Sequence, residues 1–170
     1  MRNQLFKRRT AEFIETGSHT GIGIQLALMS GFSKIYSIEL VDNYFNECVE
    51  KFKNNSNVYL ILGDSYFKLK ELLDNNPNIP FTYWLDGHYS GGDTGFGVEE
   101  SPLMKELETI LSREVKGELI YVDDMRLYRE FNESLNFPNM VKLIKRYQPD
   151  AVIWYESSPY DIEDILAIEY

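Results

Sequence analysis

The feature that most constrains the fold of this chain is an alternation of short apolar segments with longer amphipathic ones. Apolar segments of strand length lie at 12–15, 34–39, 57–62, 81–85 and 118–122. Stretches with helical spacing lie between them, at 22–30, 42–52, from 65 onward and 102–111, with Asp42 placed to cap the second and Pro102 in the first turn of the fourth. Such an alternation is typical of a parallel sheet covered by helices on both faces. We therefore expect an α/β, three-layer, doubly wound fold.

The C-terminal part breaks this alternation. After a further helix expected at 138–147, two apolar segments at 151–155 and 165–169 are separated only by the short connection 156–164. A parallel crossover normally needs about a dozen residues or more, usually including a helix. The last two strands are therefore expected to be antiparallel neighbours, in a mostly parallel seven-stranded sheet whose last strand is antiparallel.

Length and charge limit the classes of partner. At 170 residues the chain fits one domain, 1–170, and its 27 acidic against 17 basic residues give a net charge of -10. Such a surface repels phosphate backbones, so we expect a small-molecule partner and no nucleic acid. The single cysteine, Cys48, excludes an intrachain disulfide, and no apolar run approaches the roughly 20 residues of a membrane span. We expect no membrane partner, a cytoplasmic location, and a solvated turn at 7–9.

Three glycines follow the first predicted strand, at positions 17, 21 and 23. Glycine lets backbone N–H groups approach a ligand closely from the N-terminus of a helix. The spacing differs from the turn of dinucleotide enzymes, which disfavours a nicotinamide oxidoreductase. Two acids follow at later strand ends: Glu39, where an acid can accept both ribose hydroxyls, and Asp64, where one can accept the adenine amine or cap the next helix. The pattern predicts a nucleoside site.

Three aspartates end the fourth and fifth predicted strands: Asp86, Asp123 and Asp124. These strand ends are expected to be neighbours at the edge that carries the glycine loop. Carboxylates brought together in a cleft need compensation, and Mg²⁺ with oxygen ligands provides it. The alternative is that Asp86 acts without a metal, and that Asp123 and Asp124 form a turn and a helix cap, one of them paired with Arg126.

Taken together, Glu15, Gly17, Gly21, Glu39 and Asp64 resemble the successive cofactor motifs of class I S-adenosylmethionine-dependent methyltransferases, over nearly the whole chain. The resemblance implies a Rossmann-like methyltransferase fold and S-adenosylmethionine as cofactor. It also implies a glycine loop around the methionine part, Glu39 on the ribose and Asp64 near adenine. The residues expected to contact the cofactor are Glu15, Gly17, Ser18, His19, Gly21, Gly23, Glu39, Asp64, Ser65 and Asp86.

Segments 84–88 and 120–126 resemble a narrower group, the metal-dependent sugar O-methyltransferases of the macrocin O-methyltransferase type. In that group the three matching aspartates ligate Mg²⁺, and the one matching Asp86 is a candidate base. The resemblance implies an enzyme that methylates a hydroxyl of a saccharide or small natural product. His88 has a side chain suited to a general base, and the glycine-rich segment 87–97 around it, with Tyr89, Ser90 and Asp93, suits a lid over the acceptor. Tyr155 and Tyr160 are expected at the rim of a sugar site.

Two alternatives stay open: a metal-free methyltransferase in which Asp86 and His88 act alone, and a non-catalytic nucleoside-binding module. Enzymes of the narrower group usually carry extra N-terminal helices that help to form the acceptor pocket and the dimer, whereas the first strand here is expected near residue 12. Either segment 87–97 and the partner subunit of a homodimer complete the pocket, or the chain is a minimal relative.

Overall fold

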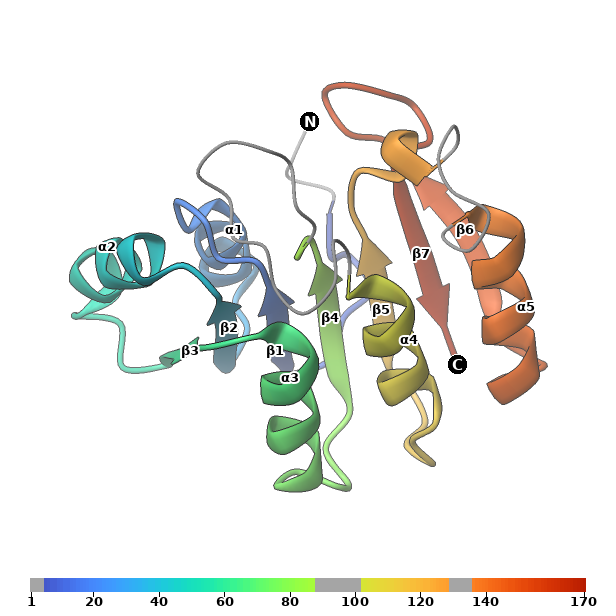
Figure 1. Cartoon of the computed structure of the whole chain (residues 1–170), viewed down its shortest axis with the longest axis horizontal. Coiled ribbons are helices and arrows are strands. Elements are labelled where there is room, and N and C mark those ends of the chain that lie inside the picture. The colour runs from blue at the N-terminus through green and yellow to red at the C-terminus, as the bar shows by residue number, and fades with distance from the viewer. Residues whose placement is uncertain (1–4, 88–101, 129–135) are drawn as a thin grey trace.

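The computed structural model describes residues 5–87, 102–128 and 136–170. Its sheet has seven strands in the order β3-β2-β1-β4-β5-β7-β6 (Figure 1). The strands are β1 (Glu12–Thr16), β2 (Lys34–Glu39), β3 (Val58–Leu62), β4 (Phe81–Leu85), β5 (Leu119–Val122), β6 (Val152–Glu156) and β7 (Ile165–Glu169). Strands β1 to β5 pair in parallel, and β7 runs antiparallel to both of its neighbours. The predicted doubly wound sheet with a reversed last strand is confirmed.

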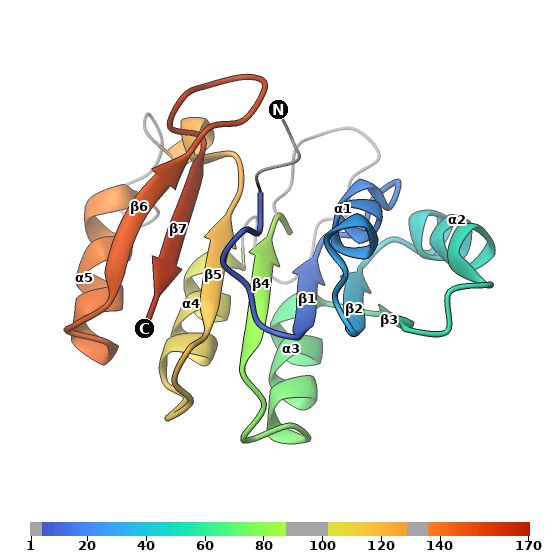
Figure 2. The ribbon, with the colours of Figure 1, turned by 180° about the vertical axis from the view of Figure 1, so that it is seen from behind.

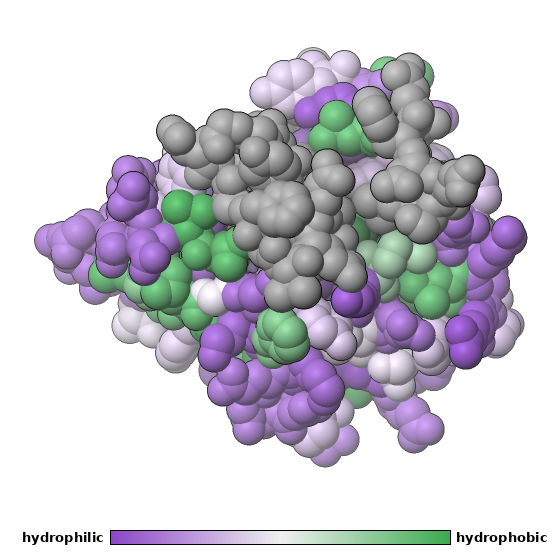
Figure 3. Space-filling view, viewed as in Figure 1, coloured by the Kyte–Doolittle hydropathy of each residue, from purple (hydrophilic) through white to green (hydrophobic). Residues whose placement is uncertain are grey.

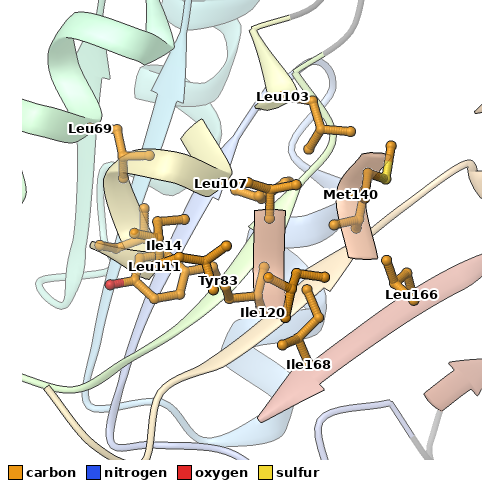
Figure 4. Close-up of a cluster of buried hydrophobic side chains, with 14 of the residues drawn as sticks. Ile14, Leu69, Tyr83, Leu103, Leu107, Leu111, Ile120, Met140, Leu166 and Ile168 are labelled. Atoms are coloured by element: carbon orange, nitrogen blue, oxygen red, sulfur yellow. The ribbon is translucent and has the colours of Figure 1, made fainter. Parts of the chain in front are cut away.

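Helices cover both faces of this sheet. Helices α3 (Ser65–Asp74), α4 (Leu103–Leu111) and α5 (Phe137–Tyr147) lie on one face, and α1 (Ile22–Ser30) and α2 (Asp42–Phe52) lie on the other (Figures 1 and 2). A short 3₁₀ helix, η2 (Met125–Tyr128), follows β5. The larger core cluster fills the α3–α5 side, where Tyr83, Leu107 and Ile120 are buried (Figure 4). No helix in the described ranges has the length and apolar character needed to cross a membrane.

Capping residues set where several helices begin and end. The Asp64 carboxylate accepts the Tyr66 N–H at the start of α3, and Asn136 accepts the Asn139 N–H at the start of α5. The predicted cap at Asp42 is wrong: Val41, in extended conformation, is the N-cap of α2, and Asp42 is its first helical residue. A carboxylate in the first turn still interacts favourably with the helix dipole. Pro102 likewise precedes α4 as its N-cap.

The N-terminal segment 5–10 packs against the sheet on the side opposite α3–α5 (Figure 2). The buried Phe6 ring makes edge-on contacts with four aromatic rings, at centroid distances of 5.2–5.7 Å; its partners are Phe13, Phe32, Trp84 and Tyr121. The Arg8 guanidinium pairs with Glu169 at 2.6 Å and lies over the Trp154 ring. Residues 7–9 are exposed, as expected of a solvated turn, and Arg8 joins this turn to the rest of the protein.

Candidate functional site

The carboxyl ends of the parallel strands bring the predicted site residues to one edge of the sheet. Backbone hydrogen bonds continue past the strand ends: Gly17 donates to Ile38 O, Asp86 to Thr16 O, and Asp123 to Leu85 O, at 2.9–3.1 Å. The glycine loop, Glu39, Asp64, Asp86 and Asp123 therefore follow successive strands at a common edge. Open α/β sheets bind their ligands at this edge.

Two glycines of the loop occupy conformations and spaces that exclude a side chain. Gly17 has φ +85°, and a Cβ there would lie 2.7 Å from the backbone oxygen of Asp86. Gly21 is the N-cap of α1 with φ +76°, and a Cβ there would lie 2.5 Å from the Phe52 ring. The loop can therefore pass close to the end of β4 only as glycine.

A buried chain of hydroxyl and carboxyl groups supports the loop from behind. The Ser37 hydroxyl donates to Glu15 Oε2 at 2.5 Å, and Ser18 Oγ lies 2.6 Å from Ser37 Oγ. Burial raises the pKa of Glu15 to about 8, although the Ser37 hydrogen bond opposes the shift. A Cβ at Gly23 would overlap Glu15 Oε1, at 1.6 Å. The side chains of Glu15 and Ser18, predicted cofactor contacts, thus lie in this buried support.

Glu39 ties the loop to the end of β2. One carboxylate oxygen accepts the His19 N–H and the other accepts the Val41 N–H, each at 2.8 Å. His19 has φ 43°, and its ring packs on Tyr44 with centroids 4.3 Å apart. Because each carboxylate oxygen has two lone pairs, both oxygens of Glu39 retain capacity for a further hydroxyl.

The next strand end combines a polar cap with exposed apolar groups. Asp64 caps α3, so the cap interpretation is confirmed, and Ser65 is the first residue of that helix. Leu40 and Leu62, which follow β2 and end β3, are 36% and 39% exposed. Apolar surface gathers near α2 on the face seen in Figure 3. The sequence analysis did not single out these two leucines. The signal that could have found them is an apolar residue close to an acid at the end of a strand.

The acids after β4 and β5 perturb one another. Burial raises the pKa of Asp86 well above its ordinary value, and Asp123 and Asp124 add to the shift. Burial raises the pKa of Asp123 to about 6, while a backbone hydrogen bond from Asp124 opposes it. Asp124 itself has φ 57°, a left-handed conformation that aspartate tolerates better than most residues. The charges after neighbouring strands are therefore within electrostatic reach of one another.

One further aspartate completes the acidic cluster. Carboxylate oxygens of Asp123, Asp124 and Asp164 lie within 4.8 Å of one another, the one such group among the described residues, and Asp86 lies outside it. Arg126 pairs with Asp124 at 2.5 Å and also with the fully buried Asp164. The predicted metal ligands included Asp86, whereas the observed group has Asp164 in its place. The expected pairing of Arg126 with a neighbouring aspartate is confirmed.

Glu106 of α4 is a buried acid that the sequence analysis missed. Its Oε2 accepts the Thr16 hydroxyl at 3.4 Å, and Ser65 also bonds to the carboxylate. Its Oε1 is buried without a partner among the described atoms, and burial raises its pKa to about 7. Glu106 therefore lies where the ends of β1 and α3 meet. In the sequence it is an ordinary acid of an amphipathic helix, and no local signal marks its burial.

Some predicted residues lie elsewhere. His88 and most of segment 87–97, including Tyr89, Ser90 and Asp93, fall outside the described residues. Tyr155 packs beside Phe137 of α5, with centroids 5.6 Å apart. Tyr160 is exposed in the β6–β7 connection, with the Arg126 guanidinium over its ring.

Comparison with known proteins identifies the fold. No family model matches the sequence, and no curated protein matches it. A candidate rRNA-methylase from Clostridium thermocellum superposes with a TM-score of 0.63 at 15% identity, over 94% of this chain and 88% of that one. SMU.1697c from Streptococcus mutans, a candidate methyltransferase in complex with SAH, superposes with a TM-score of 0.62 at 13% identity, over 94% of this chain and 87% of that one. A candidate caffeoyl-CoA O-methyltransferase from Staphylococcus aureus superposes with a TM-score of 0.57 at 17% identity, over 94% of this chain and 75% of that one. The chain has the Rossmann-like methyltransferase fold.

Proposed function

We propose that this chain is an S-adenosylmethionine-dependent methyltransferase that methylates a hydroxyl group of a sugar or another small natural product with the assistance of Mg²⁺. The observation that carries the cofactor assignment is the edge formed by Gly17, Glu39 and Asp64. There a loop closed to side chains, an acid with spare acceptor capacity and a second acid follow three adjacent strands. Exposed Leu40 and Leu62 offer apolar contacts for a purine beside these acids.

With Glu39 and Asp64 holding the nucleoside on the β2–β3 side of the edge, the methyl group would be received on the β4 side, beside Asp86. When bound, the cofactor supplies a methyl group on a positively charged sulfur, and its C–S bond breaks as the new C–O bond forms. Asp86 accepts the proton that leaves the acceptor hydroxyl. Its raised pKa makes its ionised form a stronger base than an ordinary aspartate. The loop glycines hold the donor in line, which contributes through orientation.

The carboxylates fit a hard divalent cation. Among the described residues, the three carboxylates of Asp123, Asp124 and Asp164 lie together beside the Arg126 guanidinium. Asp123, Asp124 and Asp164 are the carboxylates that lie close enough together to hold the ion, and the ion would replace the Arg126 guanidinium at Asp124 and Asp164. When bound, Mg²⁺ lowers the pKa of a hydroxyl that it coordinates.

A metal-free methyltransferase is the second candidate, and the Arg126 contacts favour it. The guanidinium already places a positive charge against Asp124 and Asp164. In that case Asp86, with His88, removes the proton without a metal. The net charge of -10 supports a neutral small-molecule acceptor and disfavours nucleic acid under either candidate.

Calorimetric titration of S-adenosylhomocysteine into the purified chain, with and without Mg²⁺, tests the proposal. We expect micromolar binding, weakened at least about tenfold in Glu39→Gln, because a carboxylate that accepts ribose hydroxyls is lost. No binding under either condition contradicts the proposed function.

The same titrations separate the two candidates. We expect a distinct Mg²⁺ heat that is lost in Asp86→Asn and in Asp124→Asn, and nucleoside affinity should be nearly unchanged in Asp124→Asn. Asp74→Asn, an exposed acid on α3, is the matched control and should keep both signals. Nucleoside binding without any Mg²⁺ heat supports the metal-free enzyme instead.

A further inference from the structure

Helix α4 turns an acid toward the interior of the protein. Its other buried residues are apolar, namely Leu103, Leu107, Ile110 and Leu111, yet Glu106 lies among them and is 1% exposed. Taking a carboxyl group out of water costs free energy unless hydrogen bonds replace the lost hydration. Its Oε2 has hydroxyl partners, whereas its Oε1 has none within the described parts of the chain. An apolar side chain at this position would avoid that cost, so packing alone does not account for a glutamate here.

The two hydroxyl groups beside Glu106 belong to the edge of the sheet that carries the candidate site. The fully buried Thr16 is the last residue of β1, and its hydroxyl donates to Glu106 Oε2 at 3.4 Å. Ser65, the first residue of α3, also bonds to the carboxylate. Glu106 thereby joins the residue before the glycine loop to the residue after Asp64.

The segment that follows β4 packs on the same two hydroxyl groups. A Cβ at Gly87 would lie 3.3 Å from Thr16 Oγ1 and 3.6 Å from Ser65 Oγ. The Asp86 N–H donates to the Thr16 backbone oxygen at 3.1 Å. The glycine loop also touches this segment, because a Cβ at Gly17 would lie 2.7 Å from the Asp86 backbone oxygen. The end of β4 is therefore in contact with both the glycine loop and the hydroxyl groups that the α4 acid holds.

These contacts give the buried acid a role in the site. We propose that Glu106 is a positioning residue, which acts on the segment after β4 through Thr16 and Ser65. Its carboxylate fixes the orientation of the two hydroxyl side chains, and these set how closely Asp86 and Gly87 approach the glycine loop. The base of the proposed reaction is thereby positioned from α4. The inference rests on the proposed function, because it concerns the position of that base beside the cofactor.

Calorimetric titration of S-adenosylhomocysteine into two Glu106 variants and two control variants tests this role. Glu106→Leu removes both acceptor oxygens, so the affinity should fall about 5- to 10-fold, as expected for the loss of about one hydrogen bond. Glu106→Gln keeps an oxygen that can accept the hydroxyl groups, so its affinity should stay close to the native value. Leu107→Ala loosens the packing of the same helix, and Glu108→Gln alters an exposed acid on it. Both controls should bind as tightly as the native chain.

These titrations separate positioning from packing. An affinity in Glu106→Leu equal to that of the native chain overturns the proposal. An equal loss of affinity in Leu107→Ala also overturns it, because general loosening of α4 would then be sufficient.

Amide NMR signals of a ¹⁵N-glycine-labelled chain report the position of the segment without any ligand. In Glu106→Leu the signals of Gly17 and Gly87 should shift, whereas that of Gly117, just before β5, should not. Unmoved signals of Gly17 and Gly87 overturn the positioning role whether or not the nucleoside binds. Absence of nucleoside binding by the native chain overturns the proposed function, and the glycine signals then still show whether Glu106 positions the segment. The two proposals therefore fail separately.

Discussion

Two buried carboxyl groups behind the glycine loop hold protons that ordinary glutamates release. Burial raises the pKa of Glu15 to about 8 and that of Glu106 to about 7, from 4.5 in both cases. Between these values and 4.5 the folded chain binds more protons than the unfolded chain. Their stabilising contribution is therefore complete below about pH 4.5 and is lost as the pH rises through 7 and 8.

We predict that the free energy of unfolding falls between pH 5.5 and pH 8.5, and that Glu15→Gln and Glu106→Gln each flatten this slope. An amide of similar shape has no proton to lose. The loss of unfolding free energy between pH 5.5 and pH 8.5 should therefore be smaller in each variant than in the native chain, by on the order of 1 kcal/mol. Urea unfolding at the two pH values measures the difference. The exposed Glu71→Gln is the control, and a slope as steep in the Glu15 variant as in the native chain contradicts the assignment.

Local signals in the sequence placed some site residues and could not place others. Glu39 and Asp64 were predicted because each follows a strand, and strand ends share an edge whatever the packing. Asp164 and Glu106 were not predicted, because they reach the site through tertiary contacts of the β6–β7 connection and of α4. The role of Ser18 as a cofactor contact stays a prediction, and its hydroxyl lies 2.6 Å from that of Ser37.

At the scale of elements, periodicity was sufficient for the helices and strands but not for the N-terminal segment. Each predicted strand and helix is present, because an apolar run of strand length or a helical period of 3.6 extends over several residues. Phe6 is a single aromatic residue before a basic run, and it has no period to reveal that it packs on the sheet. Its φ of 61° adds a conformation that bulky residues rarely adopt.

We predict that Phe6→Ala destabilises the fold by about 3–5 kcal/mol, the usual cost of deleting a buried phenylalanine. The ring contacts four aromatic side chains that would otherwise border a cavity. Arg8→Ala removes an exposed ion pair from the same segment and should cost about 1 kcal/mol or less. Urea unfolding measures both, and equal effects of the two substitutions would show that segment 5–10 is not packed as described.

Across the whole molecule, the two ends of the sheet treat buried charge in opposite ways. At the carboxyl end, Asp86 is raised in pKa by burial and by Asp123 and Asp124. At the amino end, the buried Glu118 accepts hydroxyl hydrogen bonds from Tyr83 at 2.6 Å and Tyr170 at 2.9 Å, and it pairs with Arg113. Acids that raise one another's pKa values suit a binding or catalytic site, whereas a carboxylate held by hydroxyl groups and a guanidinium suits a structural one.

This contrast predicts opposite outcomes for two substitutions of buried acids. Glu118→Ala leaves the Arg113 guanidinium buried without its carboxylate, so it should cost about 3–5 kcal/mol of stability. In the fraction that remains folded, affinity for S-adenosylhomocysteine should be unchanged, because the two ends share no side-chain contact in the described network. Asp86→Asn keeps the shape of a side chain whose ionised form is disfavoured by burial and by Asp123 and Asp124, so stability should be equal or higher while methyl transfer is lost. Thermal unfolding and nucleoside titration on both variants measure this. A Glu118 variant that is stable but binds no nucleoside, or an Asp86 variant that is strongly destabilised, contradicts the division of the sheet into a structural end and a functional end.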